Sequence, residues 1–193
     1  MRIHLRILVS SLILSACAHA QRVSAPDVHS ADAAVYLAVL DTISLPENGP
    51  RPTQLVVIDS TLTGHAQDFE LDKMPGVDST TIIDFEKRNT ESRSLRYLSS
   101  EDISVPLVLV TRQKLNSFLH NGPEAYWGEF YRRYPGSHGS IAFSSISYSA
   151  DGNVAVLIVD QGCGTLCGSL SNVVAKREGG RWRVIAFQIK IMS

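Results

Sequence analysis

The chain has 193 residues, with 18 Lys and Arg against 19 Asp and Glu, and its formal net charge at pH 7 is −1. This length suits one domain with a sizeable hydrophobic core. Binding to a phosphate backbone depends on clustered basic residues. The sequence shows no such cluster, so it argues against a nucleic-acid-binding protein.

Residues 1–16 have the pattern of a secretory signal peptide. Arg2 and Arg6 give a positive start, and residues 7–14 form an apolar run that is too short to span a bilayer. The following segment, Leu14-Ser15-Ala16-Cys17, resembles the lipobox of bacterial lipoproteins. This resemblance implies cleavage before Cys17, lipid on that cysteine and a membrane partner through the lipid anchor. Because Ala18 and not aspartate follows the cysteine, it also implies an outer-membrane location facing the periplasm.

A second cleavage site overlaps the first one. Ala18-His19-Ala20 is an A-x-A site, and cleavage after Ala20 would release a soluble periplasmic protein that begins at Gln21. Residues 17–30 are small and polar, which indicates a tether, and residues 31–193 are expected to form a single domain.

The first half of the domain alternates helical and strand patterns. Ser30 is a candidate N-cap for the helix that opens the domain. The patterns that follow predict a strand at 54–60, a loop with a helical turn at 64–75, a helix at 79–89 capped by Asp78 or Ser79, a flexible polar segment at 90–104 and a strand at 105–110.

A helix rich in aromatic residues is predicted from Pro123 to the Pro135-Gly136 break. Its spacing places rings at i, i+4 and i+8, with two more beside them. We expect the stripe to pack across a sheet, and a ring-lined ligand pocket is the alternative. The candidate pocket residues are Tyr126, Trp127, Phe130, Tyr131 and Tyr134, together with His138.

The last third predicts a four-stranded antiparallel meander. Strand patterns at 141–148, 154–159, 170–176 and 182–191 are separated by the Asp151-Gly152-Asn153 turn, a glycine-rich loop at 162–168 and the Glu178-Gly179-Gly180 turn. Helices and two strands precede this sheet, so the expected class is α+β.

Residues 126–193 resemble a group of exported bacterial proteins for which no function is known. The resemblance is carried by Tyr134-Pro135-Gly136-Ser137-His138-Gly139, by Cys163-Gly164-Thr165-Leu166-Cys167-Gly168 and by Gly180-Arg181-Trp182. It implies a shared fold and compartment and transfers no catalytic residue. The chain departs from the group at Ser169-Leu170-Ser171 and lacks the tryptophan expected near Ile191.

The sequence has three cysteines, Cys17, Cys163 and Cys167. If Cys17 carries lipid, Cys163 and Cys167 remain, and an oxidising periplasm favours a disulfide between them. Free thiols, a redox pair and a metal site are the alternatives. A redox pair usually has the C-x-x-C spacing, and a zinc site needs two more ligands that the sequence does not supply. We therefore expect no metal and no cofactor.

Two loop histidines are the candidates for catalysis. His138 lies between serines, and His65 lies near Asp68 and two further acids. The sequence shows no G-x-S-x-G nucleophile elbow. The expected function is therefore a non-enzymatic cell-envelope lipoprotein that binds an envelope protein or a small ligand. The alternative is an envelope hydrolase that uses His138 or His65 as its base.

Overall fold

The structure is a computed structural model that describes residues 28–45, 50–99, 101 and 103–192. The predicted signal peptide, Cys17 and residues 18–27 of the predicted tether lie outside the described residues. Helix α1 (Val28–Ile43) already includes residues 28–30, so the prediction that Ser30 caps it was wrong. The imidazole of His29 lies 4.8 Å from the ring of Tyr97, and this contact packs the first turn against the domain.

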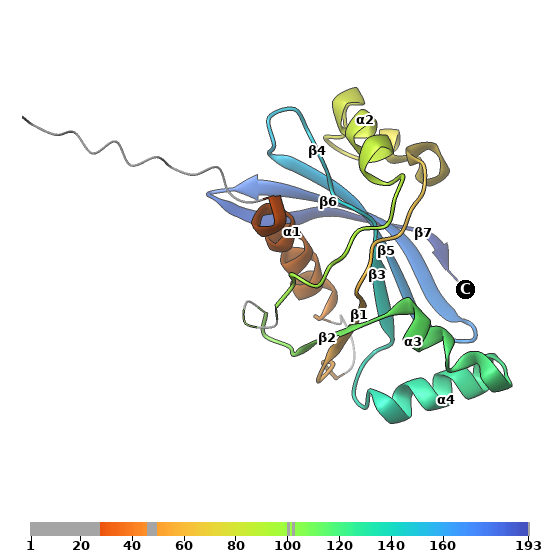
Figure 1. Ribbon diagram of the computed structural model, residues 1–193. Coiled ribbons are helices and arrows are strands. Elements are labelled where there is room, and N and C mark those ends of the chain that lie inside the picture. The colour runs from red at the N-terminus through yellow and green to blue at the C-terminus, as the bar shows by residue number, and fades with distance from the viewer. Residues whose placement is uncertain (1–27, 46–49, 100, 102, 193) are drawn as a thin grey trace, which may run out of the picture.

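One mixed sheet forms the centre of the domain (Figure 1). Its strand order is β2-β1-β3-β5-β6-β7, and the short strand β4 also pairs with β5. The strands are β1 (Leu55–Ile58), β2 (Leu107–Val110), β3 (Ser140–Phe143), β4 (Ser147–Tyr148), β5 (Val154–Gly164), β6 (Cys167–Glu178) and β7 (Arg181–Met192). The predicted α+β class is confirmed, and so is the antiparallel C-terminal meander.

The first strand of the meander is broken. The continuous strand predicted at 141–148 is two strands, β3 and β4, which both pair with β5. Side chains complete the hydrogen bonding at the break: the amide of Ile158 donates to Ser144 Oγ at 2.8 Å, and the amide of Ser145 donates to Asn89 Oδ1 at 2.7 Å. These bonds satisfy the backbone locally and let the strand bend.

The loop predicted at residues 162–168 is also shorter than expected. Strand β5 continues to Gly164 and β6 begins at Cys167, so only two residues turn between them. Gly164 and Cys167 are register partners, and the pairing therefore reaches the two cysteines. The β6–β7 turn is equally tight, because Gly179 and Gly180 have φ values of 56° and 83°, which suits a type I′ hairpin.

The two strands from the first half of the chain complete the same sheet. Strand β1 lies between β2 and β3 and is parallel to both. A parallel neighbour needs a long connection, and the segments between β1 and β2 and between β2 and β3 contain most of the remaining helices. These are η1 (Ala66–Phe69), η2 (Leu71–Lys73), α2 (Ser79–Arg88), α3 (Arg112–Asn116), η4 (Leu119–Asn121) and α4 (Pro123–Arg133).

The helices cover both faces of the sheet (Figure 1). Helix α1 packs its buried stripe on one face, with the core residues Val35, Tyr36, Val39, Leu40, Leu55, Val57, Leu157 and Val173. Helix α4 packs on the opposite face around Val56, Ile58 and Ala142, and α2 packs farther along that face around Val156, Ile158 and Val174. Each fully buried aliphatic or aromatic side chain contributes about 1.5–3 kcal/mol to folding.

Residues 90–104, predicted to be flexible, contribute to the core where they are described. Leu95 is 1% exposed and Leu98 is 6% exposed, and both pack with the α1 side of the sheet. Backbone pairing between Ser60 and Ser94 holds the segment beside the end of β1. None of the helices in the described ranges is long and apolar enough to cross a membrane.

Candidate functional site

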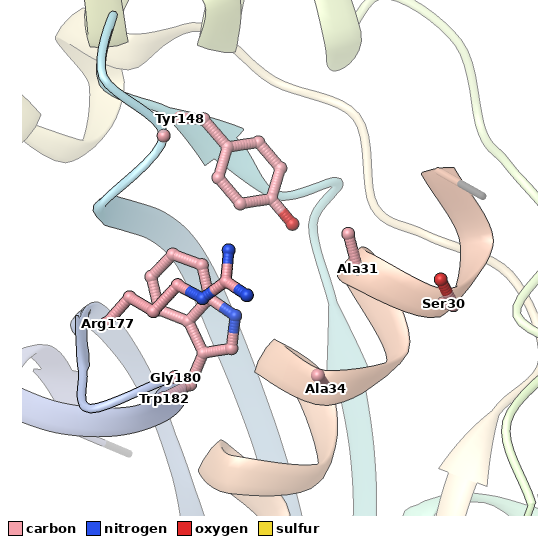
Figure 2. A pocket seen from close by; sticks show the side chains of 8 residues that line it. Ser30, Ala31, Ala34, Tyr148, Arg177, Gly180 and Trp182 are labelled. Atoms are coloured by element: carbon pink, nitrogen blue, oxygen red, sulfur yellow. The ribbon is translucent and has the colours of Figure 1, made fainter. Parts of the chain in front are cut away.

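An apolar cleft lies where the N-terminal end of α1 meets two hairpin turns. Its volume is about 320 Å³, and we call it the α1 cleft (Figure 2). Its lining comes from α1, from β4 and the turn after it, and from the β6–β7 turn. The lining residues are Ser30, Ala31, Ala34, Tyr148, Gly152, Arg177, Gly180 and Trp182.

Small residues on the helix leave the space open. Ala31 and Ala34 are one turn apart on the same side of α1, and neither has a side chain that reaches the hairpin. A second hollow continues along the helix past Ala33 and Leu37 and shares Ala34, Gly180 and Trp182 with the first. The α1 cleft is therefore one end of an open groove between α1 and the start of β7.

Two aromatic rings form the wall that faces the helix. The ring centroids of Tyr148 and Trp182 lie 5.9 Å apart at an interplanar angle of 53°. Trp182 is the register partner of Arg177, which places both side chains on the α1 side of the sheet. The aromatic wall, the alanines and the glycines give the cleft a predominantly apolar surface with one guanidinium group, that of Arg177, beside it (Figure 2).

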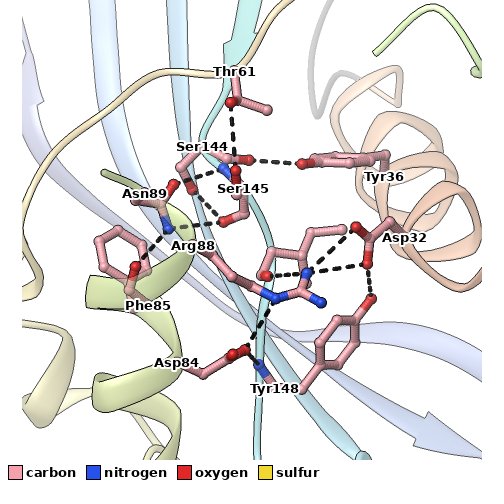
Figure 3. A network of polar contacts seen from close by, with 11 residues as sticks. Asp32, Tyr36, Thr61, Asp84, Phe85, Arg88, Asn89, Ser144, Ser145 and Tyr148 are labelled. Atoms are coloured by element: carbon pink, nitrogen blue, oxygen red, sulfur yellow. Dashed lines mark hydrogen bonds and ion pairs between the residues drawn. The ribbon is translucent and has the colours of Figure 1, made fainter. Parts of the chain in front are cut away.

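A polar network holds Tyr148 in place (Figure 3). Its hydroxyl donates to Asp32 Oδ1 at 2.7 Å, and its amide donates to Asp84 Oδ2 at 3.0 Å. Arg88 pairs with both carboxylates at 3.4 Å and donates to the carbonyl oxygen of Ile146 at 2.8 Å. The network joins α1, α2 and β4, so one wall of the cleft is fixed relative to its helix.

The surroundings of Tyr148 also keep its hydroxyl protonated. Burial raises the pKa of Tyr148 well above its ordinary value, and the Asp32 carboxylate raises it further. The Arg88 guanidinium lies 5.2 Å from the centre of the Tyr148 ring and opposes this effect. Tyr148 therefore acts as a hydrogen-bond donor and an aromatic surface.

The charges at the groove are positive. Arg177 lines the α1 cleft and Arg181 lines its continuation, and both residues are exposed. Among the described residues, no acidic side chain lines either hollow. The site can therefore hold an apolar body against the rings while an anionic group meets the arginines.

The predicted aromatic stripe packs against the sheet and is partly exposed at its edges. Phe130 is fully buried and Tyr134 is 9% exposed, and both pack against the sheet. Trp127 packs near Gly162, and the Tyr131 hydroxyl donates to the carbonyl oxygen of Cys163 at 2.7 Å. Tyr126 lines a smaller cleft on the other face of the sheet.

The two predicted histidines are separate and exposed. His65 Nδ1 lies 2.8 Å from Glu86 Oε2, at the N-terminal side of η1, and this hydrogen bond raises the pKa of His65. His138 lines a hollow of only about 30 Å³ beside Gly139 and Gln161. Within the described part of the chain, neither histidine bonds to a serine, threonine or cysteine side chain.

Cys163 and Cys167 form a disulfide in the structure, with their Cα atoms 5.0 Å apart. The bond closes the β5–β6 turn, where Cys163 also accepts the hydrogen bond from Tyr131. In the described ranges, no three His, Cys, Asp or Glu side chains come together to hold a metal ion.

Comparison of this chain with protein-family models, with curated proteins and with solved structures found no match.

Sequence reasoning missed the residues of the α1 cleft. A usable signal was present: Tyr148 precedes the Asp151-Gly152 turn, and Trp182 follows the Gly179-Gly180 turn. Two aromatic residues beside tight turns at the same end of a meander face one another when the hairpins have matching register.

Proposed function

We propose that the protein is a cell-envelope lipoprotein that binds a small amphiphilic ligand in the α1 cleft and performs no catalysis. The observation that carries this proposal is the apolar cleft between Trp182, Tyr148 and the alanines of α1, with Arg177 beside it. A mostly apolar concavity of a few hundred Å³ with a few polar groups is typical of small-molecule sites.

The chemistry of the lining defines the ligand class. The Trp182 and Tyr148 rings and the Ala34 methyl group suit a flat or extended apolar body. The Arg177 and Arg181 guanidinium groups suit a carboxylate, sulfonate or phosphate. The network around Asp32 and Arg88 supports the proposal, because a wall that is already fixed loses little entropy on binding.

The envelope location rests on the sequence around Cys17. A lipid on Cys17 would tether the domain through the same end of α1 that lines the cleft. Mass spectrometry of the mature N-terminus tests this part. A thioether-linked diacylglycerol on Cys17 supports the anchor, whereas an unmodified chain beginning at Gln21 supports the soluble periplasmic alternative.

Ligand binding is tested with 8-anilino-1-naphthalenesulfonate and with dodecanoate, which both combine an apolar body with an anionic group. The protein carries Cys17→Ser, so that no detergent is needed, and Trp127→Phe, so that Trp182 is the remaining tryptophan. We expect saturable quenching or a blue shift of the Trp182 emission with both probes.

Two variants and their controls locate the binding. Ala34→Leu fills the cleft and should abolish saturable binding. Its control, Ala38→Leu, makes the same change one turn later on α1, outside the lining of the cleft, and should leave saturable binding intact. Arg177→Gln should weaken the affinity about tenfold. Arg183→Gln removes the same charge from the opposite face of β7 and should leave the affinity unchanged. Equal effects of Arg177→Gln and Arg183→Gln would contradict the proposed site.

A further inference from the structure

A second cleft lies on the sheet face opposite α1, between the sheet and helices α3 and α4. Its volume is about 170 Å³, and we call it the α3–α4 cleft. Ala142 and Ile58 belong to the core of that face and lie at its base. Its polar lining consists of Arg112, Asn116, Tyr126, Ser140 and Asp160.

Local structure brings these polar side chains together from four elements. Thr111 caps α3 by accepting the amide of Lys114, which makes Arg112 the first residue of the helix directly after β2. On the sheet, Asp160 of β5 is the register partner of Ala142 in β3, so its side chain points to the α4 side. Ser140 begins β3 on the same face, and Tyr126 approaches from α4.

The polar side chains of this cleft are unpaired among the described residues. In the described ranges, the side chains of Arg112, Asn116, Tyr126, Ser140 and Asp160 make no hydrogen bond or ion pair with another residue. Elsewhere arginines close onto nearby carboxylates, as in the 2.8 Å contact of Arg96 with Asp59. Arg112, Asn116 and Asp160 are exposed, so their polar groups are open to a molecule that enters the cleft.

The charges of Asp160 and Arg112 nevertheless interact. Partial desolvation by the surrounding protein raises the pKa of Asp160, and the Arg112 guanidinium opposes that rise. The two side chains therefore interact electrostatically, although they lie too far apart for an ion pair, which needs an N–O distance of 4.0 Å or less.

The charge pattern selects one class of ligand. A simple anion would be attracted by Arg112 and repelled by Asp160. A simple cation would be attracted by Asp160 and repelled by Arg112. A molecule with both charges matches both groups and brings no net charge into the cleft. The volume of about 170 Å³ is enough for a molecule the size of a small amino acid.

We propose that the α3–α4 cleft binds a small zwitterion of the α-amino-acid class, with its carboxylate on Arg112 and its ammonium group on Asp160. The guanidinium of Arg112 offers the forked donors that a carboxylate accepts. The Asp160 carboxylate accepts from the ammonium group, and the Asn116 amide with the Tyr126 and Ser140 hydroxyls supplies the remaining donors and acceptors. This site is independent of the α1 cleft.

The first test needs no variant. The full chain with Cys17→Ser is titrated with glycine, L-alanine and L-serine, and binding is followed by NMR shifts of the Arg112 side chain and by calorimetry. Acetate and methylammonium serve as probes that carry only one of the two charges. We expect each of them to bind at least about tenfold more weakly than alanine.

Substitutions then assign the two charges. Arg112→Gln and Asp160→Asn should each weaken alanine binding at least about tenfold. Arg93→Gln, which changes an exposed arginine outside the cleft, should have no effect. Unchanged affinity in Arg112→Gln and Asp160→Asn, or acetate binding as tight as alanine binding, would overturn the proposal. If a variant fails to fold, the series of one-charge probes on the unaltered cleft still decides.

Discussion

Gly139 and Gly162 meet backbone to backbone where β3 starts to pair with β5. A Cβ atom on Gly139 would lie 2.0 Å from the carbonyl oxygen of Gly162, and Gly139 has a φ of 110°. The contact joins two sequence segments that are distant in the chain, the Pro135–Gly139 turn and the strand that leads to Cys163. It explains why residue 139 is a glycine, whereas a Cβ on Gly162 would lie 3.2 Å from the Trp127 ring.

Replacing Gly139 with alanine should destabilise the fold. The substitution combines the strain of a positive φ with a clash against the backbone of a strand that is paired on both sides. We expect a loss of about 2–4 kcal/mol in the free energy of unfolding, measured by chemical denaturation.

The matched control is Gly128→Ala in α4. A Cβ on Gly128 meets nothing within 4 Å, and the residue lies inside a helix. Alanine favours a helix over glycine by roughly 1 kcal/mol, so Gly128→Ala should stabilise the protein slightly. A Gly139→Ala variant as stable as the parent protein would rule out the close backbone contact.

The Cys163–Cys167 bond should contribute modestly to stability. It closes a ring of five residues, for which the loop-entropy relation gives about 2 kcal/mol. The variant with Cys163→Ser and Cys167→Ser should lose about this amount in denaturation without reductant. Dithiothreitol should lower the stability of the parent protein to that of the variant and leave the variant unchanged. A parent protein insensitive to the reductant would contradict a stabilising bond.

The meander could be predicted because its signals are local. Strand alternation, the Asp151-Gly152 and Gly179-Gly180 turns and the Pro123 helix start all act over a few residues. The position of β1 between β2 and β3 was not predictable in the same way. Parallel pairing joins segments that are distant in the chain, and no pattern inside a short strand specifies its neighbours.

The α1 cleft was missed for a related reason. Ala31, Tyr148, Arg177 and Trp182 are unremarkable in the sequence, and only the combination of two hairpin registers with the crossing of α1 brings them together. The aromatic residues of α4 could be predicted as candidate pocket residues because they are close in sequence. In the fold, Phe130 and Tyr134 are buried against the sheet and the other three rings are partly buried beside them, as expected for an apolar helix face.

Removing the Tyr148 hydroxyl should weaken the network in Figure 3 without removing the aromatic wall of the α1 cleft. Tyr148→Phe deletes the donor to Asp32, which keeps its ion pair with Arg88. We expect a loss of about 1–2 kcal/mol in the free energy of unfolding and unchanged affinity for 8-anilino-1-naphthalenesulfonate.

Tyr97→Phe is the control for that change. Tyr97 lies in the same region, and within the described residues its hydroxyl makes no hydrogen bond. Its loss should therefore leave stability nearly unchanged. If Tyr97→Phe and Tyr148→Phe have equal effects, the bond to Asp32 does not stabilise the fold.

The exposed pair of His65 and Glu86 should make stability weakly dependent on pH. The hydrogen bond to Glu86 raises the pKa of His65, and the same bond lowers the pKa of Glu86. The stabilisation from His65 is therefore complete below the unfolded histidine pKa of about 6.5 and is lost as pH rises through the higher folded pKa. The stabilisation from Glu86 is present above the unfolded glutamate pKa and is lost as pH falls through its lower folded pKa. NMR titration of His65 tests the pair. The pKa of His65 should return to its ordinary value in Glu86→Gln. It should stay raised in Glu91→Gln, which changes an exposed glutamate without a side-chain partner in the described residues. A His65 titration that does not respond to Glu86→Gln would show that the pair does not persist in solution.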